Sequence, residues 1–550
     1  MKEAVLASLR DTLMSLYGYV PDGLILSPPK EESHGDYSTN VAFLLSKELK
    51  KDPKDISRQI VERLPKEGFF AEAVNGFVNF RLGEGLIKGE LVKLIKEGRG
   101  YFFKPSERPM FLQLEFVSAN PTGPLHVGHG RGAVVGDVLS RVFERFGHSV
   151  VREYYINDAG NQIQMLGLSV FYRYCQLFGE EREDIKKVFE EEGYRGGYVL
   201  RLAKDLKVFY GKRLLEMPKE ESIDLCKEYA HRRLLEDIKE TLEALGVSFD
   251  TWFSERSLYG RGLVEEVIGL LQERDLVYEE GGALWFKSTA FGDDKDRVLR
   301  KSDRSYTYFA SDIAYHWEKY KRGFEKVINL WGADHHGYER RLMGALKALG
   351  VPEDWLRVEF VQMVRLLSGG QEVRMSKRTG EFVTLQELLE EVGTDAVRFM
   401  FLTRHGDTPL DFDIDLVKKN TSENPVFYVQ YAHARIRGVI REVRERYGLD
   451  ADKEDLTPYA EALSAGDLGL LKKCLRLKDV YEGVLQSLSP HLIPYSLLDL
   501  AKDFHHYYNH HRVMVDDRSL MLSRLALFKG VEITLKTAFD LLGIKAPERM

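Results

Sequence analysis

The chain has 550 residues, of which 44% are hydrophobic and 30% charged, and its formal net charge is −7. This composition is ordinary for a globular protein and excludes wholesale disorder, fibrous repeats and nucleic-acid binding through a diffuse positive field. At about 100–200 residues per domain, the length predicts three or four structural units.

The first region, residues 1–105, is predicted to be an α+β domain. Residues 1–20 place apolar side chains at helical spacing among charged ones, which predicts an amphipathic helix rather than a signal peptide. Residues 76–82 have the pattern of a strand. The glycines and prolines of residues 97–100 and 105–109 predict a linker to the next domain.

From Met110 the pattern changes to short apolar strands followed by amphipathic helices, which is typical of βαβ units in a parallel sheet. The predicted strands are residues 111–117, 149–156, 327–331 and 358–363, with a helix at 128–146. A charge-rich helical insertion is expected at about 165–246. We therefore predict an α/β domain over residues 106–420. Residues 421–550 show helical periods and no strand signal, so an all-α domain should complete the chain.

Two observations favour a cytoplasmic protein with no membrane contact. No apolar run approaches the roughly 18 residues that a membrane span needs. The chain has only three cysteines, Cys175, Cys226 and Cys474, which are too far apart for a disulfide framework or a CxxC metal site, so a reducing compartment is expected.

The first chemical motif follows the predicted strand 111–117. Prolines and glycine form a tight loop, and a helix begins near His126 and His129. In an open α/β sheet, ligands bind at this edge, beside a helix N-terminus that favours anions. Gly128 lets a nucleotide approach the backbone, and the two histidines can donate to one phosphate. The alternative is a dinucleotide fingerprint over residues 128–133 with Glu153 as the ribose-binding acid, which would make the protein an oxidoreductase.

The second motif, residues 368–380, is a glycine-flanked basic loop before a predicted helix at 385–392. Lys377 and Arg378 suit a pyrophosphate that gains charge as it leaves, because cations aimed at developing charge contribute most in the transition state. A dehydrogenase has no use for such a loop. The alternative is a solvated basic hairpin.

Together these motifs resemble a known family. His126-Val127-Gly128-His129 resembles the HIGH motif of class I aminoacyl-tRNA synthetases, and Arg374-Met375-Ser376-Lys377-Arg378 resembles their KMSKS loop. Other segments are similar to arginyl-tRNA synthetases in particular, and the resemblance covers essentially the whole chain. These segments are residues 34–40, 115–124, 155–162, 306–315, 423–435 and 546–550.

The resemblance implies a Rossmann-like catalytic domain, a tRNA-contacting N-terminal domain and a helical anticodon-binding domain. L-Arginine and ATP would form arginyl-adenylate, with Mg2+ neutralising phosphate charge, and the arginyl group would pass to the terminal adenosine of tRNA(Arg). The family needs bound tRNA for this activation. The catalytic residues would be His126, His129 and Lys377. ATP would be bound by His126, Gly128, His129, Met375, Ser376 and Lys377.

The resemblance also implies an arginine site. Arginine carries a planar guanidinium that stays charged, so a selective pocket needs fixed carboxylates. The implied contacts are Glu115, Ser118, Asn120, His129, Tyr308 and Asp312. We expect Asp312 to hold the guanidinium, and Asn120, Glu115 and His129 to hold the ammonium and carboxylate end. On the residues alone, Asp312 could instead be a capping or solvent-facing acid, and Tyr308 a core aromatic.

Two positions depart from the family pattern. Arg374 replaces the first lysine of the loop, and the substrate-contacting glutamine that many members have near Ala333 is missing. Asp334 or His336 could take over its role. A metal site at Asp334, His335 and His336 is the alternative, although no further ligands follow at metal-site spacing.

Contact with tRNA is expected near the end of the chain, where residues 505–512 interleave aromatic, histidine and basic side chains. We predict tRNA contacts at Tyr508, Arg512 and Met550, with Tyr428, Tyr431, His433 and Arg435 as a second candidate surface. Half of these residues could instead pack inside the bundle, and the histidines of residues 505–511 could hold zinc. A non-catalytic RNA-binding protein is the remaining alternative function. We expect a monomer.

Overall fold

A computed structural model describes residues 1–29, 31–373 and 383–550 of the chain. At its centre lies a sheet in the order β11-β10-β4-β5-β6, in which every neighbouring pair of strands is parallel. The strands are β4 Phe111–Glu115, β5 Ser149–Ile156, β6 Thr251–Ser254, β10 Lys326–Gly332 and β11 Leu356–Val361. The predicted parallel sheet is therefore confirmed. The chain order reverses beside β4, and such a switch point is where open α/β sheets bind ligands.

Helix α5, Val127–Arg145, connects β4 to β5 and packs on one face of the sheet. Neighbouring residues leave little space along α5: a side chain at Gly130 in the first turn would meet Leu385 at 2.6 Å, and one at Gly136, further along the helix, would meet the ring of Phe116 at 2.3 Å. These glycines let α5 lie close to its neighbours, so the position of its N-terminus is fixed by packing. The opposite face of β4 meets helix α13, Tyr308–Lys321, through Glu115 and Lys319.

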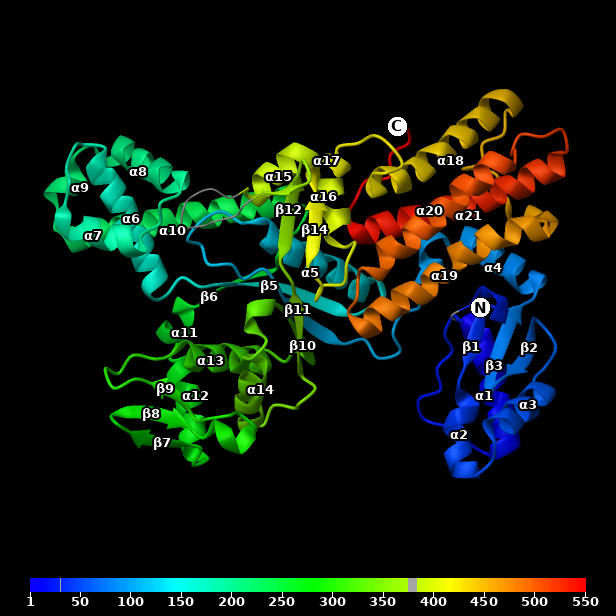
Figure 1. The fold of residues 1–550 in the computed structure, drawn as a ribbon, viewed down its shortest axis with the longest axis horizontal. Helices are drawn as coiled ribbons and strands as arrows, with labels where there is room; N and C mark the ends of the chain where they lie inside the picture. The colour runs from blue at the N-terminus through cyan, green and yellow to red at the C-terminus, as the bar shows by residue number, and fades with distance from the viewer. Residues whose placement is uncertain (30, 374–382) are drawn as a thin grey trace.

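Two insertions interrupt the sheet (Figure 1). The first lies between β5 and β6 and forms a helical arm, which confirms the predicted insertion. Its helices are α6 Asn161–Gln176, α7 Glu183–Glu192, α8 Gly197–Tyr210, α9 Arg213–Glu216 and α10 Lys219–Ala244. The second lies between β6 and β10 and contains an antiparallel sheet that the sequence did not predict. Its elements before α13 are α11 Arg256–Gly260, α12 Leu263–Glu273, β7 Val277–Glu280, β8 Ala283–Phe286 and β9 Arg297–Arg300.

A stem follows the parallel sheet and leads to the C-terminal bundle. Its small sheet pairs β12 with β13 and β14, and helix α15 is the one predicted at residues 385–392. The stem elements are β12 Val364–Ser368, β13 Gln371–Glu372, α15 Leu385–Val392, α16 Thr394–Phe401, β14 Leu410–Asp413 and α17 Ile414–Val417.

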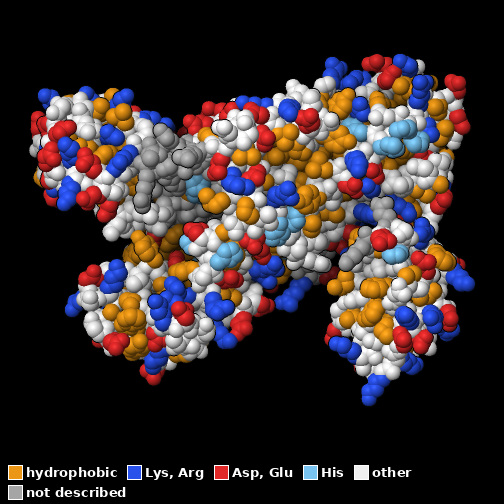
Figure 2. Space-filling model, in the orientation of Figure 1, with side chains coloured by type: hydrophobic (Ala, Val, Ile, Leu, Met, Phe, Trp, Pro, Cys, Tyr) orange, Lys and Arg blue, Asp and Glu red, His pale blue; other side chains and the backbone are white. Residues whose placement is uncertain are grey.

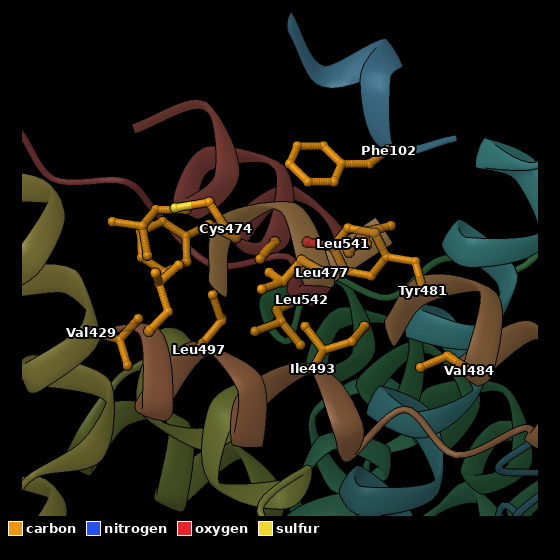
Figure 3. Packing of buried hydrophobic residues seen from close by; sticks show 14 of the residues in the cluster. Phe102, Val429, Cys474, Leu477, Tyr481, Val484, Ile493, Leu497, Leu541 and Leu542 are labelled. Carbon is orange, nitrogen blue, oxygen red and sulfur yellow. The ribbon is translucent and has the colours of Figure 1, made fainter. Parts of the chain in front are cut away.

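The end of the chain is helical, as predicted. Its four long helices are α18 Pro425–Tyr447, α19 Ala465–Ser487, α20 Leu492–His510 and α21 Arg518–Leu542. Figure 3 shows Cys474, Leu477, Leu497 and Leu542 converging between these helices, with Phe102 reaching in from outside the bundle. Phe102 belongs to a short 3-10 helix, Gly98–Phe102, and its ring lies 5.7 Å from that of Tyr481. The segment predicted as a linker is thus anchored in the bundle core.

The N-terminal domain is an antiparallel sheet, β1-β3-β2, packed against helices. Its elements are α1 Lys2–Tyr17, β1 Tyr37–Thr39, α2 Val41–Leu49, α3 Pro53–Arg63, β2 Phe69–Val74 and β3 Phe77–Leu82, and α4 Glu84–Glu97 follows. The domain docks on α19, because Tyr37 donates to Asp479 at 2.6 Å and Lys472 donates to Asp36 at 3.0 Å. Among the described residues, no helix is long and apolar enough to cross a membrane.

Candidate active site

The loop after β4 begins with an unusual backbone. The predicted strand 111–117 ends early, at Glu115, and Val117 and Ser118 have φ values of 70° and 40°. Left-handed backbone is strained for a β-branched residue, so other contacts must hold it. Ser118 provides them: its hydroxyl donates to Glu115 at 2.9 Å and accepts from the backbone N–H of Tyr155 at 3.1 Å.

The two histidines lock the start of α5. His126 is the N-cap, and its Nδ1 accepts from the backbone N–H of Gly128 at 3.1 Å, while Nδ1 of His129 accepts from the N–H of His126 at 3.3 Å. The rings stack with centroids 3.6 Å apart. Because each Nδ1 is an acceptor, the ring proton of each neutral imidazole lies on Nε2. The space at Gly128 is tight, since a side chain there would lie 3.1 Å from the ring of His126. Both histidines therefore lie at a helix N-terminus, which favours anions.

The stem meets this histidine pair directly. Leu385 N–H donates to Leu125 O at 2.8 Å, and His126 pairs with Thr384 in an antiparallel bridge. On the other side of the basic loop, Val373 N–H donates to Leu366 O at 2.9 Å in the stem sheet. The residues predicted for the loop lie outside the described residues. These are Arg374, Met375, Ser376, Lys377 and Arg378.

Helix α13 carries Tyr308 and Asp312 one turn apart, as the sequence predicted. It lies on the face of the sheet from which the side chain of Glu115 projects. Tyr308 is 60% exposed, so it is not a core aromatic. Asp312 is partly buried and is neither a cap nor solvent-facing, and it accepts a hydrogen bond from the hydroxyl of Tyr338. Burial raises the pKa of Asp312 to about 7, and the negative charge of Glu255 adds to this effect. No Lys or Arg among the described residues forms an ion pair with Asp312.

Glu115 is held differently. Its second carboxylate oxygen accepts from the buried ammonium of Lys319 at 2.6 Å, and Lys319 also donates to Asn329 at 3.1 Å. Lys319 and Tyr338 were missed by the sequence analysis. Helical spacing could have placed Lys319 seven residues after Asp312 on the same face, but nothing in the sequence marked Tyr338. Glu115 thus has a charged partner inside the protein.

Other predicted residues lie at the same edge. Asn120 donates to Gln162 at 2.6 Å, which ties the loop after β4 to the start of α6. From the helical arm, Tyr198 donates to the carbonyl of Thr122 in this loop at 2.8 Å. The hydroxyl of Tyr198 thus reaches from the arm to the loop that leads to the histidines.

The segment after β10 does not form a metal site. Asp334 and His335 are largely exposed, and His336 stacks on Phe360 with ring centroids 3.8 Å apart. Among the described residues, no group of three or more His, Cys, Asp or Glu side chains is placed to hold a metal ion, which also argues against zinc at residues 505–511.

Glu153 cannot be a ribose-binding acid. It is fully buried, and its carboxylate binds Arg322 at 2.6 Å and Tyr315 at 2.5 Å. A carboxylate with these partners has no capacity to reach a ligand at the sheet edge. The dinucleotide interpretation therefore fails on geometry.

The two candidate RNA-binding surfaces, at residues 505–512 and 428–435, are adjacent in the structure. Arg435 of α18 lies between the rings of Tyr431 and Tyr508, at 4.6 Å and 4.8 Å from their centroids. Half of the cluster at 505–512 packs inward, as the alternative held: His505 and Tyr507 are buried, whereas Arg512 is exposed. Figure 2 shows histidine side chains grouped on the surface of the C-terminal bundle.

The end of the chain lies close by. His433 is buried and its ring bonds to the carbonyl of Pro547 at 2.8 Å, and Gln430 donates to the carbonyl of Lys545 at 3.0 Å. These contacts fix the terminal segment against α18. Met550, which is 51% exposed, lines a pocket of about 340 Å³ beside the stem.

Comparison with known proteins covers the chain from end to end. The family described as "tRNA synthetases class I (R), catalytic domain" matches residues 93–404. "Arginyl tRNA synthetase N terminal domain" matches residues 1–82, and "DALR anticodon binding domain" matches residues 429–550.

Curated relatives and solved structures agree with these matches. The chain is 50% identical to a protein of Aquifex aeolicus named arginine–tRNA ligase, with 100% of both chains covered. It is 43% identical to arginine–tRNA ligase 1 of Halalkalibacterium halodurans, over 100% of this chain and 98% of that one. The fold matches that of Thermus thermophilus arginyl-tRNA synthetase with a TM-score of 0.77 at 23% identity, over 100% of each chain.

Proposed function

The chain belongs to the arginyl-tRNA synthetases, and on that premise we propose that arginine, ATP and the end of tRNA meet where β4 runs into α5. The reaction is the ligation of arginine to tRNA. The arginine carboxylate attacks the α-phosphorus of ATP and releases pyrophosphate, and a hydroxyl of the terminal adenosine then displaces AMP. No side chain needs to become a covalent nucleophile, so catalysis consists of positioning and charge stabilisation.

The observation that carries the arginine assignment is the state of Asp312. It is a partly buried carboxylate with one hydroxyl donor and no ion-pair partner among the described residues. A guanidinium supplies a permanent charge and forked donors. We propose that Asp312 binds it, that Tyr308 lies over it, and that Glu115, Ser118, Asn120 and His129 hold the other end of the substrate.

ATP is assigned to the histidine pair. His126 and His129, with the helix start at Gly128, would lie against the phosphates of ATP, where a helix N-terminus favours negative charge. Met375, Ser376 and Lys377 would close on the nucleotide from the loop. Mg2+, which we propose enters bound to the phosphates, would neutralise their charge.

The remaining domains are assigned to tRNA. We propose that residues 1–105 and 421–550, which flank the catalytic residues 106–420 in sequence, bind tRNA, with Tyr508, Arg512 and Met550 in contact with it. Bound tRNA would then be required for arginine activation. We further propose that the protein acts as a monomer in the cytoplasm, where its three buried, unpaired cysteines stay reduced.

ATP–pyrophosphate exchange with each amino acid, with and without tRNA, tests the proposal. We expect exchange with arginine alone, and only when tRNA is present. Exchange without tRNA would overturn the requirement for tRNA, and exchange with a neutral amino acid would overturn the arginine site.

A further inference from the structure

The N-terminal domain docks against α19 of the C-terminal bundle (Figure 1), and a cavity of about 330 Å³ lies at this junction. One wall comes from the N-terminal domain and the other from α19 and α20. Among the described residues, only glycines and charged side chains line it. Without aromatic rings it cannot stack a base, so it suits a small charged group. The charged residues are Asp36, Arg81, Lys472, Lys473, Arg476 and Asp503.

Asp36 joins the two walls of the cavity. It is 5% exposed, and its carboxylate accepts from the backbone N–H of Leu82 at 2.8 Å. From α19, Lys472 donates to the same carboxylate at 3.0 Å and Arg476 at 3.4 Å. The side chains of Lys472 and Arg476 stay 25% and 28% exposed, so both cations keep access to the cavity. Two cations on one carboxylate leave one positive charge in excess.

Arg81 of β3 adds a second positive charge, from the wall of the N-terminal domain. Its side chain is exposed, and its guanidinium donates to the backbone carbonyl of Ser33 at 3.1 Å. No carboxylate among the described side chains forms an ion pair with Arg81. A guanidinium has five N–H donors in a planar fork, so most of them are available to a ligand.

The acid on the α20 side of the cavity is already paired. Asp503 and its neighbour Asp499 each lie 2.7 Å from Lys473. The positive charge in excess is therefore concentrated around Arg81 and Lys472. Because the whole chain carries a net charge of −7, this cavity is a local reversal of sign. An acidic protein needs such local patches to bind nucleic acid.

The cavity also lies between the two units to which tRNA binding was assigned. Its α20 wall includes Asp503, five residues before Tyr508 on the same helix. Its other wall includes Arg81 in the sheet of the N-terminal domain. A nucleic acid that contacts both units has to cross this junction, and its backbone carries a negative charge at every phosphate.

We propose that this cavity binds a backbone phosphate of tRNA through Arg81 and Lys472 and thereby fixes the tRNA at the junction between the N-terminal domain and the bundle. The inference rests on the proposed binding of tRNA by residues 1–105 and 421–550. A guanidinium matches a phosphate with two parallel N–H donors, and the lysine ammonium adds a point charge. Phosphate contacts orient a nucleic acid without reading its sequence. The site therefore contributes affinity and register, and not the choice of tRNA.

The test is Arg81→Gln in the full-length protein, with the Kd for tRNA(Arg) measured at a series of salt concentrations. Loss of one phosphate contact releases about one counterion fewer, so the slope of log Kd against log salt should fall by about 1. At low salt we expect the Kd to rise about fivefold, the size typical of an exposed charge pair. Arg81→Lys keeps the charge and should keep the slope.

Arg58→Gln is the matched control. Arg58 lies on α3 of the same domain, its side chain is 66% exposed, and it pairs with Asp55 at 3.2 Å without lining the cavity. The control removes the same charge from the same domain, so an effect of net charge alone would appear in both variants. We expect Arg58→Gln to keep the wild-type slope.

The outcomes separate the cavity from the proposed function. If the wild-type protein does not bind tRNA(Arg), the proposed function fails and this inference fails with it. If the wild type binds and folded Arg81→Gln keeps its Kd and slope, or Arg58→Gln changes them equally, only the cavity assignment is wrong. A lower melting temperature with a wild-type slope would mean that Arg81 merely holds Ser33. Should Arg81→Gln fail to fold, Lys472→Gln decides: a smaller slope supports the proposal, and a wild-type slope overturns it.

Discussion

The pKa and the ion pairing of an acidic residue in this protein depend on its surroundings as well as on its type. Glu115 and Asp312 are both acids next to the same sheet edge, yet Glu115 is neutralised by Lys319 at 2.6 Å and Asp312 receives only a hydroxyl hydrogen bond. The pKa of Asp312 is raised to about 7, first by burial. The environment therefore leaves the two carboxylates in different states, and this difference is the basis for the proposal that Asp312 binds the substrate cation.

Asp312→Asn keeps the shape of the side chain and removes its charge. A charge-assisted hydrogen bond contributes about 2–3 kcal/mol, so we expect the arginine KM to rise roughly 30- to 150-fold. Competition assays with citrulline, the neutral analogue, should show a reduced preference for arginine. Unchanged selectivity in a folded variant would mean that another acid holds the guanidinium.

Arginine binding should depend on pH near neutrality. The guanidinium binds the ionised form of Asp312, whose pKa is about 7 in the free protein. Above pH 7 the carboxylate is charged and affinity is complete. Below pH 7 it is increasingly protonated, so the arginine KM should rise about tenfold per pH unit. Exchange assays between pH 5.5 and 8.5 measure this, and the dependence should disappear in the Asp312→Asn protein.

Lys377 is expected to act on the leaving pyrophosphate. Because a loop cation meets developing charge mainly in the transition state, Lys377→Ala should lower kcat for adenylate formation far more than it weakens arginine binding. Single-turnover and steady-state kinetics separate the two effects. A raised arginine KM with unchanged kcat would contradict this role.

At the scale of elements, α5 is the part that unites the site. Its first turn carries the histidine pair, and one turn further the fully buried Arg131 is fixed to the stem. The guanidinium of Arg131 donates to the carbonyls of Gln362 at 3.0 Å, Thr408 at 2.8 Å and His405 at 2.8 Å. Burial without a carboxylate partner lowers the pKa of Arg131 to about 10. The stem therefore sets the position of the histidines through backbone carbonyls.

Arg131→Met should show this coupling. The variant fills most of the space but leaves several buried carbonyls without donors, so we expect a loss of about 2–4 kcal/mol in the free energy of unfolding. The kcat for adenylate formation should also fall. Denaturant unfolding and exchange assays measure the two effects. Arg145→Met, at the exposed end of the same helix, is the control and should cost under about 1 kcal/mol. Equal losses in both variants would show that Arg131 has no special role.

Two hairpins of the fold have turn sequences that favour a hairpin and that the sequence analysis did not consider. Asn75 and Gly76 have φ values of 52° and 86° between β2 and β3, and Gly281 and Gly282 have 60° and 76° between β7 and β8. Asn-Gly and Gly-Gly favour these two-residue turns because both positions need positive φ. Local turn chemistry could have predicted both hairpins, whereas the parallel pairing of β12 with β14 depends on contacts distant in sequence.

At the scale of the whole molecule, the N-terminal domain, the linker and the bundle form one structure. Asp36 and Tyr37 bind α19, and Phe102 of the linker enters the bundle core. Truncation of the bundle would therefore expose apolar surface on the rest of the chain. A loss of tRNA binding could then result from unfolding instead of from the loss of a tRNA contact. Point changes on the surface test tRNA recognition more cleanly.

Tyr508→Ala and Arg512→Ala should each raise the KM for tRNA and leave the KM for ATP nearly unchanged. Loss of a stacked base contact costs about 1–3 kcal/mol, which corresponds to roughly 5- to 150-fold. Tyr508 also packs against Arg435, so the melting temperature of the Tyr508→Ala protein must be measured along with its KM for tRNA. Folded variants with normal tRNA affinity would place the contact elsewhere on α18 or at the chain end.

The sequence by itself determined the parallel sheet, the helical arm, the all-helical end and the place of the histidine pair at the start of a helix. These features rest on local periodicity and on residue types at fixed spacing, which a single sequence displays. Tertiary structure alone decided which acids are neutralised. Glu115 and Lys319 are 204 positions apart, and Tyr338 reaches Asp312 from a different element. Charge state depends on burial and on partners distant in sequence, so only the folded chain distinguishes Asp312 from the acids that are already paired.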